Sequence, residues 1–140
     1  MRTTVLLSCA SKKRLQKCKA RDLYDSPLFK LSLKYAEKFD SGNIFILSAL
    51  HGLVKLDEFI EPYNVTLNRL SKLDRKEWAT KVLQQLMDSG FDLDADKFIF
   101  LAGANYRKYL IPHIQHYEIP MEGLRIGQQL AYLKRRVSGE

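Results

Sequence analysis

The sequence predicts an α/β fold, a three-layer sandwich around a mainly parallel, Rossmann-like sheet of about four strands. Short apolar runs of strand length alternate along the chain with amphipathic stretches of helical length. Such alternation is typical of strand–helix–strand units, whose right-handed crossovers produce a parallel sheet. The apolar runs are nearly continuous, as expected for strands that are covered on both faces.

The chain is predicted to form a single domain over residues 1–140. Its 140 residues suit one domain, and 46% hydrophobic and 11% aromatic residues are typical of a globular protein. No apolar run approaches the roughly 20 residues of a membrane span, and the N-terminal run is too short for a signal peptide. We therefore expect a cytoplasmic protein without a membrane partner, and its oligomeric state is left open.

The N-terminal part predicts one strand and one helix. Residues 3–9, TTVLLSC, predict a buried strand, and the basic segment after them predicts a loop. Ser26 suits a helix N-cap and Pro27 suits the first helical position. Apolar residues then recur at helical spacing, and Gly42 is expected to end this helix.

The middle of the chain predicts a second strand and a long helix. Residues 43–49, NIFILSA, predict a buried strand, and the segment from His51 to Tyr63 predicts a loop. A helix is predicted over residues 68–90, with Asp74 as the N-cap of a capping box and Gly90 as its end.

The C-terminal part completes the alternating pattern. Residues 97–102, KFIFLA, predict a third strand, and Gly103 begins a turn into a helix that carries Tyr106. A short fourth strand is expected near residues 117–119, and a last helix is predicted over residues 126–136.

The charge distribution indicates a phosphate-bearing partner. The formal net charge is +7, from 23 basic and 16 acidic residues. Residues 1–21 carry several basic side chains and no acidic one, and a second basic group follows Arg125 near the C-terminus. A basic surface attracts phosphates, so nucleic acid or a nucleotide is the expected partner. The alternative is a basic surface that only keeps the protein in solution.

The segment after the first strand is a candidate anion site. In open α/β sheets, ligands bind beyond the carboxyl ends of the strands. Ser8, Cys9, Lys12 and Lys13 stand at this position and offer hydroxyl, amide and ammonium groups that suit a phosphate. The segment has no glycine and therefore lacks the spacing of an ATP-binding P-loop. Cys9 is either a thiol activated by the lysines or a structural cysteine.

The carboxyl ends of the other two strands add further candidates. Ser48 and His51 follow the second strand, and His51 suits an acid, a base or a hydrogen-bond donor. Gly103 and Tyr106 follow the third strand, where an anion can meet a helix N-terminus or the glycine can simply serve the turn. All three strand ends are expected to converge on one edge of the sheet.

The predicted loop after His51 supplies candidate carboxylates. Glu61 precedes a proline that keeps its backbone extended, so its carboxylate is a candidate general base or sugar ligand. Asp57 is expected to be an ordinary solvated charge. Tyr63 and Tyr106 are candidates for stacking on a nucleobase, and their alternative role is packing at the edge of the site.

No metal site or cofactor is expected from the sequence. Cys9 and Cys18 are too few for a cysteine zinc site. His113 and His116 have a spacing that suits metal binding on a helix, but no third ligand stands nearby. We therefore interpret the two histidines as polar residues near a helix end.

Five motifs together resemble a small family of uncharacterised bacterial and phage proteins. The motifs are LLSCASKK, ARDLYDSPLFK, LSALHGLVKLDEFIEPYNVTLN, FLAGANYRKYL and PMEGLRIGQQLAYL, and they span nearly the whole chain. That family is distantly similar to the YaaA family of peroxide-stress proteins. It also resembles the uracil-DNA-glycosylase-like domain attached to some tRNA-guanine transglycosylase-type proteins.

The resemblance implies a nucleic-acid or nucleobase context. It marks Asp22 as a candidate catalytic residue, and Tyr24, Gln128 and Gln129 as candidate ligand-binding residues. The chain has no helix-hairpin-helix motif, which would have supported binding to duplex DNA. It also lacks the water-activating and histidine-bearing motifs of uracil-DNA glycosylases, which argues against uracil excision.

The expected function is therefore a nucleotide-, nucleobase- or nucleic-acid-directed one. An enzyme of glycosidic-bond or base-modification type is the first hypothesis, with Glu61, His51 and Asp22 as catalytic candidates. Cleavage at an anomeric carbon passes through a cationic transition state, which a carboxylate stabilises. The alternatives are a non-catalytic DNA- or RNA-binding stress-response protein and a small-ligand sensor.

Overall fold

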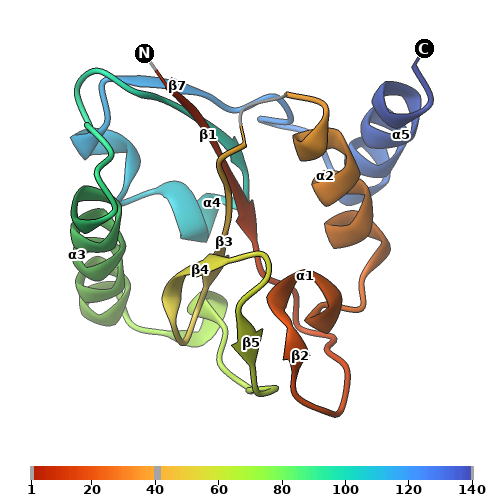
Figure 1. The fold of residues 1–140 in the computed structure, drawn as a ribbon, viewed down its shortest axis with the longest axis horizontal. Coiled ribbons are helices and arrows are strands. Elements are labelled where there is room, and N and C mark those ends of the chain that lie inside the picture. The colour runs from red at the N-terminus through yellow and green to blue at the C-terminus, as the bar shows by residue number, and fades with distance from the viewer. Residues whose placement is uncertain (1, 40–41, 140) are drawn as a thin grey trace.

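The chain folds into a mixed α/β structure (Figure 1). The computed structural model describes residues 2–39 and 42–139. The strands are β1 (Thr3–Ser8), β2 (Cys18–Lys19), β3 (Ile44–Ser48), β4 (Gly52–Lys55), β5 (Phe59–Ile60), β6 (Lys97–Leu101) and β7 (His116–Glu118). The α-helices are α1 (Ala20–Leu23), α2 (Pro27–Glu37), α3 (Lys72–Asp88), α4 (Ala104–Arg107) and α5 (Ile126–Val137), and the 3₁₀ helices are η1 (Leu67–Arg69) and η2 (Ile111–His113).

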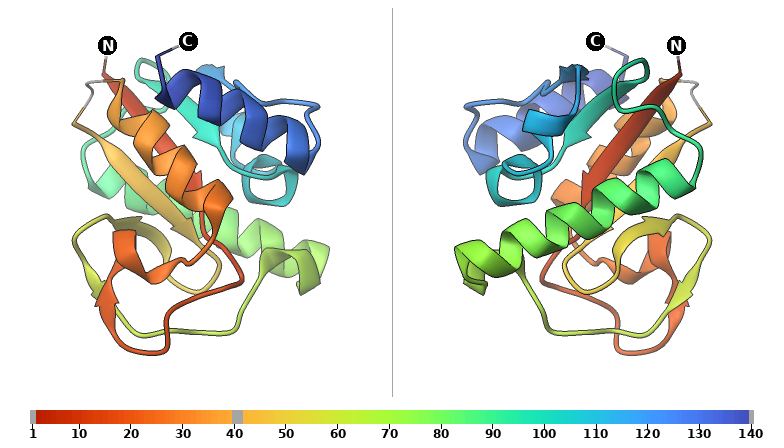
Figure 2. Two further views of the ribbon diagram at one scale, coloured as in Figure 1. Left: turned by 90° about the vertical axis from the view of Figure 1, so that its right-hand side faces the viewer. Right: turned by 90° about the vertical axis from the view of Figure 1, so that its left-hand side faces the viewer.

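A five-stranded, mostly parallel sheet forms the centre of the fold. Its strand order is β4-β3-β1-β6-β7. Strand β1 pairs in parallel with β3 and β6, and β6 pairs in parallel with β7, whereas β4 runs antiparallel to β3 at the edge. Helix α3 lies on one side of this sheet, and α2 and α5 lie on the other (Figures 1 and 2).

Alternating side chains of the central strands fill two separate cores. In β1, Leu6 packs on the α3 side, whereas its neighbours Val5 and Leu7 pack on the side of α2 and α5. Phe100 and Leu101 of β6 divide between the two cores in the same way. Both faces of each central strand are therefore buried, which explains why the sequence shows continuous apolar runs rather than alternation.

The long central strands and the last helix agree with the sequence prediction. β1, β3 and β6 lie within the predicted ranges, and β7 forms where a short fourth strand was expected. α5 covers the predicted 126–136 and extends by one residue to Val137. Ser26 caps α2 by accepting a hydrogen bond from the Phe29 amide (3.3 Å).

The segment after His51 is not the loop that the sequence predicts. Gly52 has a positive φ of 75°, which lets the chain turn directly into β4 alongside β3. The short strand β5 follows and pairs with β2, so the basic segment before residue 21 is also partly ordered as β2 and α1. The turn was missed because a single glycine marks it.

Helix boundaries differ from the prediction at three places. α3 begins at Lys72 with Ser71 as its N-cap, because the Ser71 hydroxyl accepts a hydrogen bond from the Asp74 amide (3.1 Å). α2 ends at Glu37, before Gly42, which lies in the turn that leads to β3. The helix after Gly103 is the single turn α4, followed by η2.

None of the helices in the described ranges is both long enough and apolar enough to cross a lipid bilayer.

Candidate functional site

The carboxyl ends of β1, β3 and β6 meet at one edge of the sheet. The three strands are parallel neighbours, with Ser8 of β1 opposite Leu47 of β3 and Leu7 of β1 opposite Leu101 of β6. The predicted convergence of the three strand ends is therefore confirmed. We call this side of the sheet the carboxyl edge.

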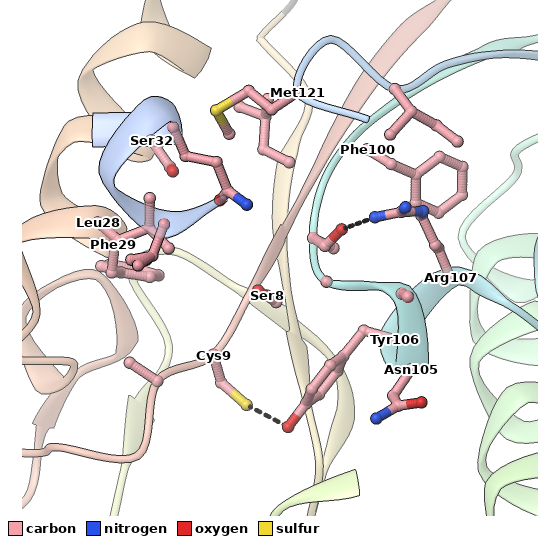
Figure 3. Close-up of a pocket in the computed structure, with 18 of the residues that line it drawn as sticks. Ser8, Cys9, Leu28, Phe29, Ser32, Phe100, Asn105, Tyr106, Arg107 and Met121 are labelled. Carbon is pink, nitrogen blue, oxygen red and sulfur yellow. Dashed lines mark hydrogen bonds between the residues drawn. The ribbon is translucent and has the colours of Figure 1, made fainter. Parts of the chain in front are cut away.

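A cavity of about 440 Å³ opens at this edge between β1 and β6 (Figure 3). Ser8 and Cys9 line it from the end of β1. Leu28 and Phe29 of α2 lie across the cavity from Tyr106 and Arg107 of α4, as Figure 3 shows. The remaining lining residues that carry polar side chains are Ser26, Ser32, Asn68, Asn105 and Gln129.

The lining of the cavity contains no carboxylate among the described residues, and Arg107 is its one charged side chain. The Arg107 guanidinium donates a hydrogen bond through Nη1 to the carbonyl oxygen of Ala102 (2.6 Å). This bond holds the arginine beside the end of β6. Polar and apolar side chains therefore share the walls of the cavity, and the one charge among them is positive.

Two helices of more than two turns begin at the cavity. Ser26 and Leu28 line it from the start of α2, and Leu124 and Ile126 line it from the start of α5. Amide groups in the first turn of a helix lack partners within the helix and carry partial positive charge. The start of α5 therefore reinforces the positive character of the cavity, whereas at the start of α2 Pro27 has no amide hydrogen and the Phe29 amide already donates to Ser26.

A network of hydroxyl groups lies beside the cavity, between the ends of β1 and β3. The Tyr24 and Tyr63 hydroxyls share a hydrogen bond of 2.6 Å. The Ser48 hydroxyl donates to the Tyr63 hydroxyl (2.7 Å) and accepts from the amides of Leu50 and His51. Burial raises the pKa of both tyrosines well above the ordinary value, so both stay protonated near neutral pH.

Lys13 and His51 cover this hydroxyl network. The Lys13 ammonium lies 4.4 Å from the centre of the Tyr63 ring and 5.8 Å from that of Tyr24. Such cation–π contacts stabilise an ammonium group that is partly withdrawn from water. Burial lowers the pKa of the Lys13 amine. The His51 ring meets the Tyr63 ring edge to face, with 5.5 Å between ring centres.

Cys9 lines the cavity and lies near the hydroxyl network, because after burial its charge is a further cause of the raised pKa of Tyr63. Its thiol donates a hydrogen bond to the Tyr106 hydroxyl (3.4 Å), which Figure 3 shows at one end of the cavity. The Tyr106 hydroxyl also accepts a bond from the Leu67 amide (3.4 Å), and its ring packs edge to face on Trp78. Burial, and then the charge of the nearby Cys9, raise the pKa of Tyr106 to about 12.

The structure brings together most of the candidates that the sequence indicates. Five of them line the cavity, namely Ser8, Cys9, Gly103, Tyr106 and Gln129. Five more form the neighbouring network, namely Lys13, Tyr24, Ser48, His51 and Tyr63. Cys9 lines the cavity and lies near the network.

Four candidates lie outside both the cavity lining and the neighbouring network. Glu61 and Asp22 are exposed, and neither has a hydrogen bond from its carboxylate to the network. Lys12 is exposed and forms a long ion pair with Asp25 (3.9 Å). Gln128 uses its side-chain oxygen to accept a hydrogen bond from the Arg125 amide at the start of α5 (2.8 Å).

Several lining residues were not candidates in the sequence. Ser32, Arg107 and Asn105 reach the cavity only because α2 and α4 pack around the carboxyl edge. Ser26 and Pro27 did signal where α2 begins. A helix that follows a parallel strand starts near the carboxyl edge, so that signal was sufficient to place the start of α2 beside the site.

The two histidines whose spacing suits metal binding lie in different elements. His113 lies in η2 and His116 in β7, so the spacing that suggested a helix does not place them on one helix face. Within residues 2–39 and 42–139, no group of three or more histidine, cysteine or acidic side chains is arranged to hold a metal ion. Asp57 is 70% exposed, as expected, with Lys19 and Arg21 each 3.9 Å away.

Comparison with known proteins assigns the chain to a family but not to an activity. A model of a family of unknown function, DUF6884, matches residues 4–135. This match covers most of the chain, so the protein belongs to that family. No curated protein matches the sequence at a significant level. The evidence on function therefore comes from the geometry of the site.

Proposed function

We propose that this member of a family of unknown function binds a phosphate-bearing ligand of nucleotide size in the cavity at the carboxyl edge. One observation carries the proposal: among the described residues that line the cavity, the only charged side chain is Arg107. A carboxylate in the lining would repel a phosphate, and none is present there.

The position of the cavity supports the same proposal. Parallel α/β sheets bind ligands beyond the carboxyl ends of their strands, and helix starts in this region favour anions. The start of α5 reaches the cavity. The layers of α3, sheet, and α2 with α5 fit the three-layer, Rossmann-like organisation that the sequence indicates.

The size and side chains of the cavity suit a nucleotide. A volume of about 440 Å³ lies within the range of small-molecule sites. Asn68 and Asn105 supply amide groups that donate and accept hydrogen bonds. The nucleic-acid context that the family resemblance implies points to the same ligand class.

The proposal concerns binding rather than glycosidic-bond cleavage. Glu61 and Asp22 were the carboxylates expected to assist cleavage, and neither lines the cavity. If the protein acts on its ligand, the groups closest to the cavity are the Cys9 thiol and the Tyr106 hydroxyl.

Calorimetric titration with nucleoside monophosphates and the matching nucleosides tests this proposal. We expect the monophosphates to bind and the nucleosides to bind much more weakly. Ala104 is exposed, lines the cavity and begins α4, where a carboxylate favours the helix. Ala104→Glu should therefore fold normally and weaken monophosphate binding by on the order of 2 kcal/mol, roughly thirtyfold.

Ala95→Glu is the matched control. Ala95 is equally exposed but precedes β6, at the end of this strand opposite the cavity. It should leave the affinity unchanged although it adds the same charge to the protein. Equal binding of nucleosides and monophosphates, or equal losses in the two variants, would refute the proposal.

A further inference from the structure

A second hollow lies along α5 and adjoins the cavity. It has a volume of about 540 Å³ and is lined by Leu124, Gln128, Ala131, Tyr132, Arg135 and Arg136. We call it the α5 groove. Leu124, two residues before α5, lines both hollows. The groove extends from this point to the last turn of the helix, over about 18 Å.

The groove carries positive charge that acidic side chains do not neutralise. Arg135 and Arg136 are exposed, and neither forms an ion pair with an acidic side chain in the described parts of the chain. Like the cavity, the described lining contains no carboxylate. No acidic side chain of the protein competes for these two arginines, so the groove suits an extended anionic ligand.

An aromatic ring and an amide accompany the two arginines. The Arg136 guanidinium lies 4.8 Å from the centre of the Tyr132 ring. Tyr132 is held from the other side by Tyr35 of α2, whose ring meets it edge to face and whose hydroxyl lies 3.3 Å from its own. Exposed arginines beside an aromatic ring are a combination with which proteins hold single-stranded nucleic acids.

We propose that the α5 groove binds the backbone of a single-stranded nucleic acid, one nucleotide of which occupies the cavity. This inference rests on the proposed function of the cavity and specifies its ligand as a strand rather than a free nucleotide. A nucleotide inside a cavity must be unpaired and unstacked. The strand leaves the cavity over Leu124, and its phosphates lie against Arg135 and Arg136.

The shape of the site favours a strand over an anionic membrane surface. A planar bilayer would contact exposed arginines but would not fill a groove that continues into a cavity. A nucleic-acid strand fills both hollows and presents a phosphate at each nucleotide.

The test compares ligands of different length. It also compares two variants that each remove two positive charges, one inside the groove and one outside it. Fluorescence anisotropy would measure binding of labelled oligothymidylates of one to about eight nucleotides across a salt series. We expect affinity to rise with length as the strand reaches the groove. Arg135→Gln/Arg136→Gln should lower the affinity for the longest strand by roughly 25-fold at 0.1 M salt. The slope of log affinity against log salt concentration should become shallower by about 1.4. The affinity for thymidine monophosphate should stay unchanged.

Lys55→Gln/Lys81→Gln is the control for charge alone. Lys55 lies in β4 and Lys81 in α3, at the edge of the sheet away from β7, and both are exposed. This variant removes the same number of charges and should keep full affinity for the long strand. Unfolding in urea checks that each variant folds as the native chain does.

Three results would overturn the inference and remain distinct from failure of the proposed function. The first is monophosphate binding without any gain from a longer strand. The second is an equal loss of strand affinity in the two double variants. The third is arginine-dependent binding to phosphatidylserine vesicles that matches binding to the strand. Failure of monophosphate binding itself would instead refute the proposed function, and with it the strand path through the cavity.

Discussion

Tyr106 is the lining residue of the cavity that makes the most contacts with other parts of the fold. Its ring lines the cavity and packs on Trp78, while its hydroxyl accepts hydrogen bonds from the Cys9 thiol and the Leu67 amide. Sequence alone indicated Tyr106 as a ligand-binding candidate because it follows the third strand. It could not indicate the contact with Cys9, since these two residues are 97 positions apart.

The raised pKa of Tyr106 predicts a loss of stability at alkaline pH. Its pKa is about 12 in the folded protein and about 10 in the unfolded chain. The folded state thus favours the protonated hydroxyl of Tyr106. The contribution of this hydroxyl to the free energy of unfolding is complete below about pH 10 and is lost as pH rises to about 12. The free energy of unfolding of Tyr106→Phe should therefore fall less steeply over this interval. Urea unfolding of both proteins at several alkaline pH values measures these free energies. If the free energy of unfolding falls equally steeply with pH in the two proteins, the prediction is contradicted.

At the scale of elements, the connection between β3 and β4 depends on one glycine and one glutamine. Gly52 adopts a positive φ, and the Gln85 side chain of α3 lies against it. Gln85 accepts a hydrogen bond from the Leu53 amide (2.8 Å) and donates one to the His51 carbonyl (3.2 Å). The hairpin was not predicted because its partner glutamine lies on a helix more than thirty residues away.

Gly52→Ala should destabilise the fold more than Gly90→Ala does. Both glycines have a positive φ, which costs a non-glycine residue about 1 kcal/mol. A Cβ atom at Gly52 would also lie 2.3 Å from the Gln85 side-chain oxygen, whereas one at Gly90 meets nothing within 4 Å. Displacement of Gln85 should add roughly 1–2 kcal/mol. Urea unfolding of both variants tests this, and equal losses would show that Gln85 adjusts without cost.

The buried strands were more predictable than the connections between them. β1, β3 and β6 show as continuous apolar runs because both faces are covered. The short elements β2, β4, β5 and α1 have no such signal, since two to four residues are too few for a period to be recognised. Their positions depend on tertiary pairing, as in the β2–β5 ribbon.

At the scale of the whole molecule, topology explains both the success and the limit of the site prediction. Parallel strands place their carboxyl ends together, so Ser8, Ser48 and Gly103 could be assigned to one edge from sequence. The cavity itself depends on how α2, α4 and α5 pack around that edge. Glu61 directly follows β5 and lies outside the cavity lining, so its catalytic role stays a prediction.

The crystal structure of the protein with a bound nucleoside monophosphate tests the central claim most directly. We expect the phosphate in the cavity, beside Arg107 and the start of α5. We also expect the base beside the amide groups of Asn68 and Asn105. A nucleotide bound elsewhere, with its phosphate on the exposed basic segment of residues 11–17 and the cavity empty, would contradict the account.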